Sequence, residues 1–123
     1  MLGLGQSTPA APSTDLVFDT SEATFMQDVI EASQTVPVIV DFWAPWCGPC
    51  RTMAPEFNKA AQALKGKARL VKLNTEQYQT VSQKLGIRGI PTMIGFRDGK
   101  EVFRQSGAMP AQQIEKLIKT HTR

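Results

Sequence analysis

Apolar and polar residues follow one another along this chain in two rhythms, one typical of strands and one typical of helices. Residues 38–43, Val-Ile-Val-Asp-Phe-Trp, form a nearly continuous apolar run, which predicts a central strand covered on both faces. Two later runs flank Asp98-Gly99, a dipeptide that strongly favours a two-residue hairpin. The predicted strands are residues 16–18, 38–43, 69–73, 92–97 and 100–104.

Apolar residues at helical spacing predict a helix after each of the first three strands and another after the hairpin. Asp19 and Glu22 fit a capping box, in which both side chains bond free amides at the start of the first helix. Pro55 is expected to bend the second helix. The other helices are predicted from about Cys50 to Gly66, across residues 78–85, and from Pro110 onward.

The resulting order is β-α-β-α-β-α-β-β-α, which defines an α/β fold. Strands joined through helices run parallel, whereas the closing hairpin is antiparallel, so we expect one mixed sheet with helices on both faces. The 123 residues suffice for one core and are too few for two ordinary domains. Residues 1–14, which are uncharged, are expected to be a flexible lead-in, and residues 15–123 the folded domain.

The composition argues against several classes of protein. The longest stretch without an ionisable side chain is residues 1–14, shorter than the ~20 apolar residues of a membrane-spanning helix. Those residues also lack the basic and apolar regions of a secretory signal, so a soluble, cytoplasmic protein is expected. Residues 1–50 carry six acidic and no basic side chains, and residues 51–123 carry fourteen basic and five acidic ones. The basic residues are spread singly, so no nucleic-acid partner is expected.

Cys47 and Cys50 are the two cysteines of the chain. They lie between the buried strand and a helix, a context typical of a redox pair. A structural zinc site needs four Cys or His ligands, and the chain adds only His121 to the pair. A structural disulfide across two residues closes too small a loop to constrain the unfolded chain appreciably. A working thiol pair without a metal is therefore the preferred interpretation.

The position of the pair predicts a role for each thiol. At the start of a helix, free backbone amides and the positive end of the dipole favour an anion, so Cys47 is expected to be the nucleophilic thiolate. Cys50 lies one turn into the helix, where its sulfur faces Cys47 and is less accessible to a partner. Cys47 then attacks a partner's disulfide, and Cys50 resolves the mixed disulfide.

Residues 38–50, VIVDFWAPWCGPC, closely resemble the thioredoxin family. The likeness covers roughly residue 15 to the C-terminus and is carried further by Lys72-Leu73-Asn74, GIRGIPT at 86–92, Asp98-Gly99 and Gly107-Ala108. It implies a thioredoxin fold and a monomeric protein-disulfide reductant that takes part in cell redox homeostasis. It also implies no bound cofactor, client proteins with disulfides as partners, and electrons supplied from NADPH by thioredoxin reductase.

Asp41 and Lys72 are the candidate residues behind the cysteines. Asp41 lies inside the apolar strand, where desolvation would raise its pKa and let it accept a proton near neutral pH. The alternative is a carboxylate held only by local hydrogen bonds. The matching aspartate of thioredoxins helps to deprotonate the resolving thiol, so the resemblance favours Asp41 as a catalytic proton acceptor and donor. Lys72 is either a snorkelling lysine or, as the resemblance implies, a residue with a tuning role.

The remaining candidate residues are expected around the reactive sulfur of the cysteine pair. By base rate the Ile90–Pro91 bond would be trans, but the resemblance implies a cis bond, with Pro91 packed against the cysteines. Ile90 then presents backbone groups to an extended client peptide, as in strand addition. Trp43 is expected in the core. The positions that match the family's flat apolar rim are Trp46, Gly48, Pro49, Gly89, Ile90, Gly107 and Ala108.

Alternatives to a reductant remain open at this stage. Thr75 and Ser106 replace apolar residues that are usual in thioredoxins, which bears on client preference and not on the chemistry. The same fold serves oxidants and isomerases, although Gly48-Pro49 resembles the reducing members. A further hypothesis is a redox-controlled binding module or subunit that docks partners through the rim around Trp46. Replacement of Cys47 would spare such binding but abolish disulfide reduction.

Overall fold

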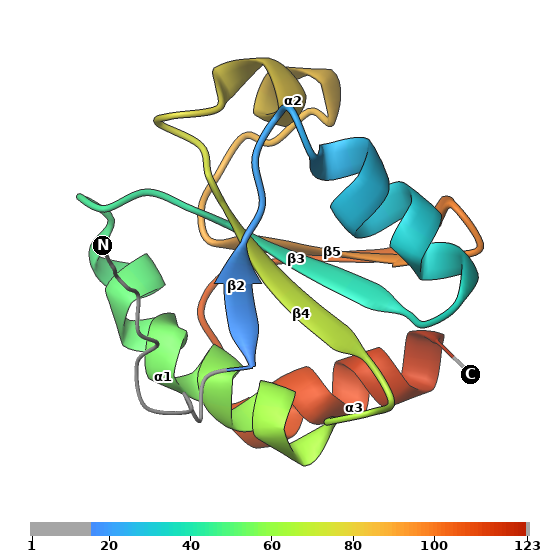
Figure 1. The fold of residues 1–123 in the computed structure, drawn as a ribbon. Coiled ribbons are helices and arrows are strands. Elements are labelled where there is room, and N and C mark those ends of the chain that lie inside the picture. Colours follow the sequence, from blue (N-terminus) through green and yellow to red (C-terminus); the bar gives the residue numbers. More distant parts are fainter. Residues whose placement is uncertain (1–15, 123) are drawn as a thin grey trace, which may run out of the picture.

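Strand β3 (Val38–Trp43) lies in the middle of a twisted sheet (Figure 1). The structure is a computed structural model that describes residues 16–122, so the predicted lead-in at 1–14 lies outside the described residues. The first five residues of β3 are buried, as the apolar run predicted. β3 pairs in parallel with β4 (Arg69–Asn74) and antiparallel with β5 (Thr92–Arg97). The central strand therefore joins the two directions of the sheet.

The edge strands complete the mixed sheet. β2 (Val17–Asp19) pairs in parallel with β4, and β6 (Lys100–Ser106) pairs antiparallel with β5. The strand order is β2-β4-β3-β5-β6, which confirms the predicted mixed α/β sheet. Asp98 and Gly99 both have positive φ, 55° and 79°, and turn β5 into β6. This is the backbone twist that a two-residue hairpin requires.

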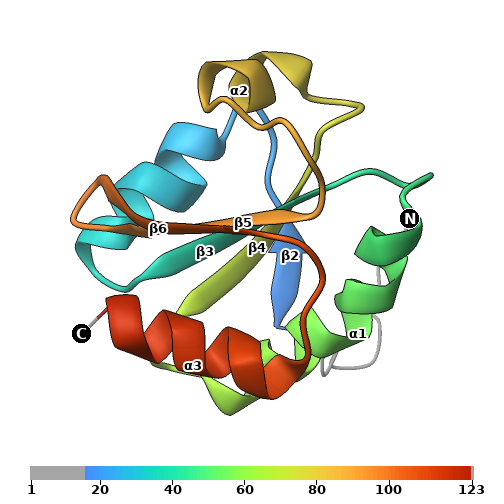
Figure 2. The same cartoon turned by 180° about the vertical axis from the view of Figure 1, so that it is seen from behind.

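Helices cover both faces of the sheet (Figures 1 and 2). α1 (Gly48–Ala63) and α3 (Ala111–His121) pack together on one face over a core that includes Phe57 and Ile114. The other face carries the π-helix η1 (Met26–Glu31), the 3-10 turn η2 (Ala32–Gln34) and α2 (Gln79–Lys84). None of the described helices is long and apolar enough to cross a bilayer.

The first predicted helix differs from the structure in its geometry and in its cap. Asp19 ends β2 and caps no helix, so the predicted capping box is wrong. Ser21 instead accepts the amide of Thr24 at 3.2 Å. Glu22 accepts the amide of Val81 in α2 at 3.0 Å, across 59 residues of chain. The sequence pattern was local, whereas the amide that Glu22 satisfies is brought to it by tertiary packing.

Two helix boundaries also shift by small amounts. α1 begins at Gly48, two residues before the predicted start at Cys50, and continues through Pro55 to Ala63. Pro110 is the residue immediately before α3, with extended backbone, and so stands one position ahead of the predicted first turn. The earlier start of α1 matters most, because it places Cys47 directly at the helix N-terminus.

Candidate active site

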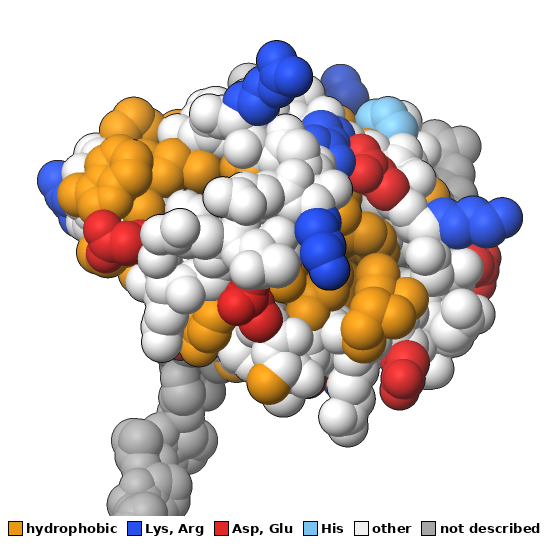
Figure 3. All heavy atoms as spheres, turned by 90° about the horizontal axis from the view of Figure 1, so that it is seen from above, with side chains coloured by type: hydrophobic (Ala, Val, Ile, Leu, Met, Phe, Trp, Pro, Cys, Tyr) orange, Lys and Arg blue, Asp and Glu red, His pale blue; other side chains and the backbone are white. Residues whose placement is uncertain are grey.

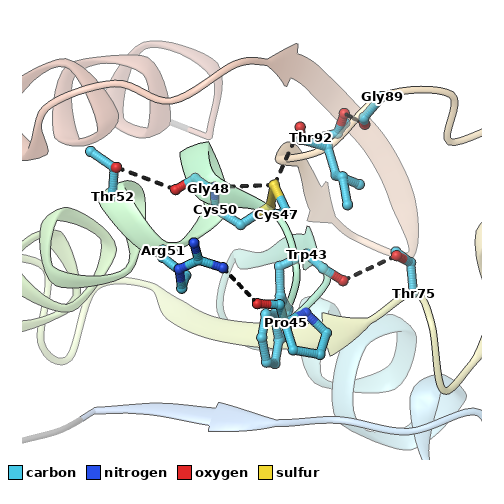
Figure 4. The surroundings of a disulfide bond; sticks show 11 residues. Trp43, Pro45, Cys47, Gly48, Cys50, Arg51, Thr52, Thr75, Gly89 and Thr92 are labelled. Atoms are coloured by element: carbon cyan, nitrogen blue, oxygen red, sulfur yellow. Dashed lines mark hydrogen bonds between the residues drawn. A yellow bond between two sulfur atoms is a disulfide. The ribbon is translucent and has the colours of Figure 1, made fainter.

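The two cysteines form a disulfide at the N-terminus of α1 (Figure 4). Cys47 is the N-cap residue, with φ −87° and ψ 112°, and its sulfur accepts the backbone N–H of Cys50 at 3.2 Å. Pro49 occupies the first turn, where its missing N–H leaves no donor unsatisfied. The amide of Cys50 and the positive end of the helix dipole both point at the Cys47 sulfur, an arrangement that favours an anion there.

Cys50 is the more buried partner of the pair. Its residue exposure is 2%, against 5% for Cys47. Ala44 forms a small buried cluster with the two cysteines, and the partly buried Trp43 and Ile90 pack against this cluster. The Cys47 sulfur lies 3.8 Å from the carbonyl oxygen of Ile90; a disulfide sulfur carries no proton, so this is a contact and not a hydrogen bond. Cys47 thus lies beside the backbone that the sequence singled out for client binding.

Asp41 is fully buried in β3, and within residues 16–122 neither of its carboxylate oxygens has a hydrogen-bond partner. Burial raises the pKa of Asp41 from 3.8 to about 7, and the positive charge of Lys72 opposes part of that rise. The alternative of a carboxylate held by local hydrogen bonds is therefore wrong. A buried carboxyl that titrates near neutral pH is suited to exchanging a proton with a nearby thiol.

Lys72 approaches Asp41 without bonding to it. The two residues are register partners on β4 and β3. The ammonium of Lys72 lies 4.3 Å from the centre of the Trp43 ring, a cation–π geometry. Trp43 itself is half-buried, and its buried indole nitrogen has no hydrogen-bond partner in the part of the chain that the structure describes. Lys72 is therefore held by the tryptophan face and acts on Asp41 through charge alone.

The loop around Pro91 faces the cysteines from the other side. The Ile90–Pro91 bond is cis, as the resemblance implied, and Pro91 is buried. The amide of Gly107 donates to the carbonyl of Pro91 at 2.9 Å. Thr92 donates its hydroxyl to the carbonyl of Gly89 at 2.6 Å (Figure 4). These bonds bring the loop before β5 and the end of β6 to one side of the disulfide.

The predicted rim is exposed around the sulfur atoms. Trp46 is 66% exposed, the largest fraction among the exposed large apolar side chains of residues 16–122. Ile90 is half-buried. The other rim positions are exposed: Gly48, Pro49, Gly89, Gly107 and Ala108. On the face drawn in Figure 3, Lys and Arg side chains are scattered singly, so this face carries no basic patch.

Comparison with known proteins agrees with this geometry. Residues 16–120 match the family model described as Thioredoxin. The chain belongs to the thioredoxin family. It is 44% identical over 101 residues to Thioredoxin 1 of Synechococcus elongatus, which covers 82% of this chain and 92% of that protein. It is 40% identical over 102 residues to the thioredoxin of Pseudomonas aeruginosa, which covers 83% and 93%. It is also 44% identical over 101 residues to an M-type chloroplastic thioredoxin of Chlamydomonas reinhardtii, which covers 82% and 71%.

Membership in the thioredoxin family, together with the disulfide, establishes the chemistry of the site. The protein is a thiol–disulfide oxidoreductase whose redox centre is Cys47 and Cys50. Proteins of the thioredoxin family work without a bound cofactor. Within residues 16–122 there is no cluster of His, Cys, Asp or Glu that could hold a metal ion.

Three hydrogen bonds at this thioredoxin-family site, made by two residues, were not expected from the sequence. Arg51 donates from its guanidinium to the carbonyl of Pro45 at 2.9 Å (Figure 4). Thr75 donates both its amide and its hydroxyl to the carbonyl of Trp43, at 2.8 and 3.0 Å. In the sequence, Thr75 stands out only as a departure from the family pattern, and no sequence signal indicates Arg51. All three bonds fasten the loop that carries Trp46 and Cys47.

A cleft beside Trp46 extends the rim toward α2. Its volume is about 440 Å³. Its lining mixes the apolar side chains of Trp46 and Ile90 with polar groups of Thr75, Gln79 and Arg88. The Thr75 hydroxyl is already bonded to Trp43, so this wall presents less free polar surface than the sequence suggests. A volume of about 440 Å³ lies within the range of pockets that hold small ligands.

Proposed function

We propose that this protein reduces the disulfides of client proteins and is itself reduced by a thioredoxin reductase that draws electrons from NADPH. The carrying observation is the environment of the Cys47 sulfur. One backbone amide bonds it, and among residues 16–122 no Lys, Arg or His donates to it. Strong stabilisation of the thiolate favours the reduced form and makes a pair an oxidant. The lack of a Lys, Arg or His donor at this sulfur, among residues 16–122, supports the reducing direction.

The reaction proceeds in two exchanges. The Cys47 thiolate attacks one sulfur of the client's disulfide, forms a mixed disulfide, and releases the client's other sulfur as a thiolate. The Cys50 thiolate then attacks the Cys47 sulfur, which forms the Cys47–Cys50 disulfide and releases the client's second sulfur. Two electrons pass to the client, and the protein ends in the disulfide form. The reductase reverses these steps on the protein.

Asp41 and Lys72 supply proton control in this proposal. Asp41 accepts the proton of the Cys50 thiol, which makes Cys50 a nucleophile when the mixed disulfide is present. Support comes from the burial of Asp41 and from its pKa of about 7. Lys72 tunes Asp41 by its positive charge, which keeps that pKa from rising further. Pro91 and the rim hold the client's backbone beside the sulfur of Cys47.

The reduction potential of the pair tests the direction of electron transfer. Titration against dithiothreitol or glutathione, followed by the fluorescence of Trp43 and Trp46, gives this value. A potential near ~−270 mV, typical of thioredoxin, supports a reductant, whereas one near ~−120 mV contradicts it. The exposed Trp46 also favours a second candidate, a redox-controlled binding module. A client that still binds the Cys47→Ser protein would support that candidate.

A cytoplasmic location and a monomeric state complete the proposal. A reducing compartment suits a pair that must be kept as dithiol between reactions. Fractionation of cells that express the full chain tests the location, and recovery in an exported fraction would contradict it. Sedimentation of the reduced protein tests the monomeric state.

A further inference from the structure

Glu56 links the helix that carries the cysteines to the start of α3. It lies on α1, six residues after Cys50. One carboxylate oxygen accepts the backbone amide of Ala111, the first residue of α3, at 3.0 Å. The other oxygen lies 3.4 Å from the ammonium of Lys59, which is on the surface. The bond to Ala111 spans 55 residues of chain and is therefore a tertiary contact.

The amide of Ala111 depends on Glu56 for its partner. α3 has no side-chain cap of its own, because Pro110 precedes it and no acidic residue lies in its first turn. Ala111 is buried, so water does not readily replace a lost acceptor. The same hydrogen bond is the main cause that lowers the pKa of Glu56 below its ordinary value. Glu56 thus serves as the cap that the sequence of α3 lacks.

The segment just before α3 contains two positions of the client rim. Gly107 and Ala108 connect β6 to Pro110 and Ala111. At its first end this segment is tied to the loop before β5, because the amide of Gly107 donates to the carbonyl of Pro91. Gly107 itself has φ 96°, a conformation that a glycine adopts freely. Met109, farther along the segment, packs against the core, and Glu56 ties the second end of the segment at Ala111.

We propose that Glu56 is a positioning residue for client recognition. Through Ala111 it holds Gly107 and Ala108 at a fixed place relative to Cys47, because α1 carries both Glu56 and the cysteine pair. Glu56 bonds neither sulfur, so its loss should weaken the docking of a polypeptide and leave thiol exchange unchanged. This inference rests on the proposed reduction of client disulfides.

The test compares a protein client with a small disulfide. The variants are Glu56→Ala, Glu56→Gln and the control Lys59→Ala, which removes only the surface ion pair. With insulin as client, Glu56→Ala should raise KM by about three- to tenfold and leave kcat unchanged, the size expected for one lost hydrogen bond. The rate with dithionitrobenzoate and the reduction potential should not change. Glu56→Gln should recover most of the loss, because its amide oxygen still accepts from Ala111.

Three results would overturn the inference. The first is an insulin KM that is equal in Glu56→Ala and wild type. The second is an equal loss with dithionitrobenzoate, which would mean general damage. The third applies if Glu56→Ala does not fold, and it uses Glu56→Gln, whose neutral amide accepts more weakly than a carboxylate. It is faster hydrogen exchange of the Ala111 amide in Glu56→Gln than in wild type, together with an unchanged insulin KM. A wild-type protein that does not reduce insulin would instead defeat the proposed function, and protection of the Ala111 amide by Glu56 would still be measured.

Discussion

The region behind the cysteine pair is buried, whereas the region in front of it is exposed. Behind the disulfide, Asp41 is completely buried and Lys72 lies on the ring of Trp43. In front, Trp46 is 66% exposed, and Ala108 is also open to solvent. Burial changes the proton affinity of a group, whereas exposure leaves apolar surface available to a partner. Changes behind the pair should therefore alter chemistry and stability, and changes in front should alter client binding.

The largest expected effect is at the sulfur atoms that separate the two regions. Cys47→Ser should abolish the reduction of insulin, because no nucleophile remains to open the client's disulfide. In Cys50→Ser, Cys47 should still attack the client's disulfide, but no second thiol is present to release the client. A mixed disulfide between Cys47 and the client therefore accumulates. Non-reducing electrophoresis and mass measurement detect this species, and the double-serine variant is the control. Trapping by Cys47→Ser in place of Cys50→Ser would reverse the assigned roles.

Asp41→Asn should change both stability and rate. The pKa of Asp41 is about 7 in the folded protein and 3.8 in the unfolded reference, so between these values the folded state holds the extra proton. The contribution of Asp41 to the free energy of unfolding is therefore fully present below about pH 4. It is lost as the pH rises through about 7, by roughly 4 kcal/mol in all. Asn cannot ionise, so the variant should lack this slope. Release of the client from the mixed disulfide should slow by about tenfold or more at neutral pH.

Urea unfolding from about pH 4 to about pH 8 measures the slope for Asp41→Asn. Glu31→Gln is the matched control, because Glu31 is an exposed carboxylate. If the free energy of unfolding has the same pH dependence in wild type and in Asp41→Asn, the raised pKa of Asp41 is contradicted.

Trp46→Ala should affect binding with little effect on stability. The side chain is mostly exposed, so the free energy of unfolding should change by less than about 0.5 kcal/mol. The KM for insulin should rise by about tenfold, since an exposed aromatic at the edge of the disulfide is a typical binding hot spot. Met26→Ala, at a residue that is 61% exposed, is the control for loss of apolar surface. A large loss of stability without a change in KM would show that Trp46 belongs to the core.

The smallest expected effect is that of Lys72→Met. The ammonium of Lys72 lowers the pKa of Asp41, so its removal should move that pKa above about 7. Titration of the Asp41 carboxyl by carbon NMR measures the shift, with Lys84→Met as the control for loss of a surface charge. A pKa that falls or stays constant would mean that Lys72 acts only by packing on Trp43.

Local patterns were sufficient for most of the architecture. The apolar run at 38–43 became β3, and Asp98-Gly99 became the turn between β5 and β6. These predictions succeed because strand burial and turn geometry depend on neighbouring residues. The candidate cysteine pair was also predictable, since its spacing and its position between a buried strand and a helical pattern indicate a redox pair.

The same local reasoning failed where a polar side chain had distant partners within reach. Glu22 was expected to cap its own helix and instead caps α2. Glu56 carried no signal in the sequence, although it supplies the cap of α3. In both cases the donor amide is more than 50 residues away, at separations of 59 and 55. Only the folded chain decides which unsatisfied amide lies beside a carboxylate.

Residue patterns along the chain are enough to give the order of elements, the place of Cys47 and Cys50, and the presence of an acid inside the central strand. Tertiary structure decided how those groups behave. β4 and β5 flank Asp41 on β3, none of the residues 16–122 bonds its carboxylate, and its burial raises its pKa to about 7. Lys72 was placed on Trp43 by the register of β3 and β4. Desolvation and charge depend on what surrounds a group in space, and that is fixed only when the sheet and its two helical layers come together.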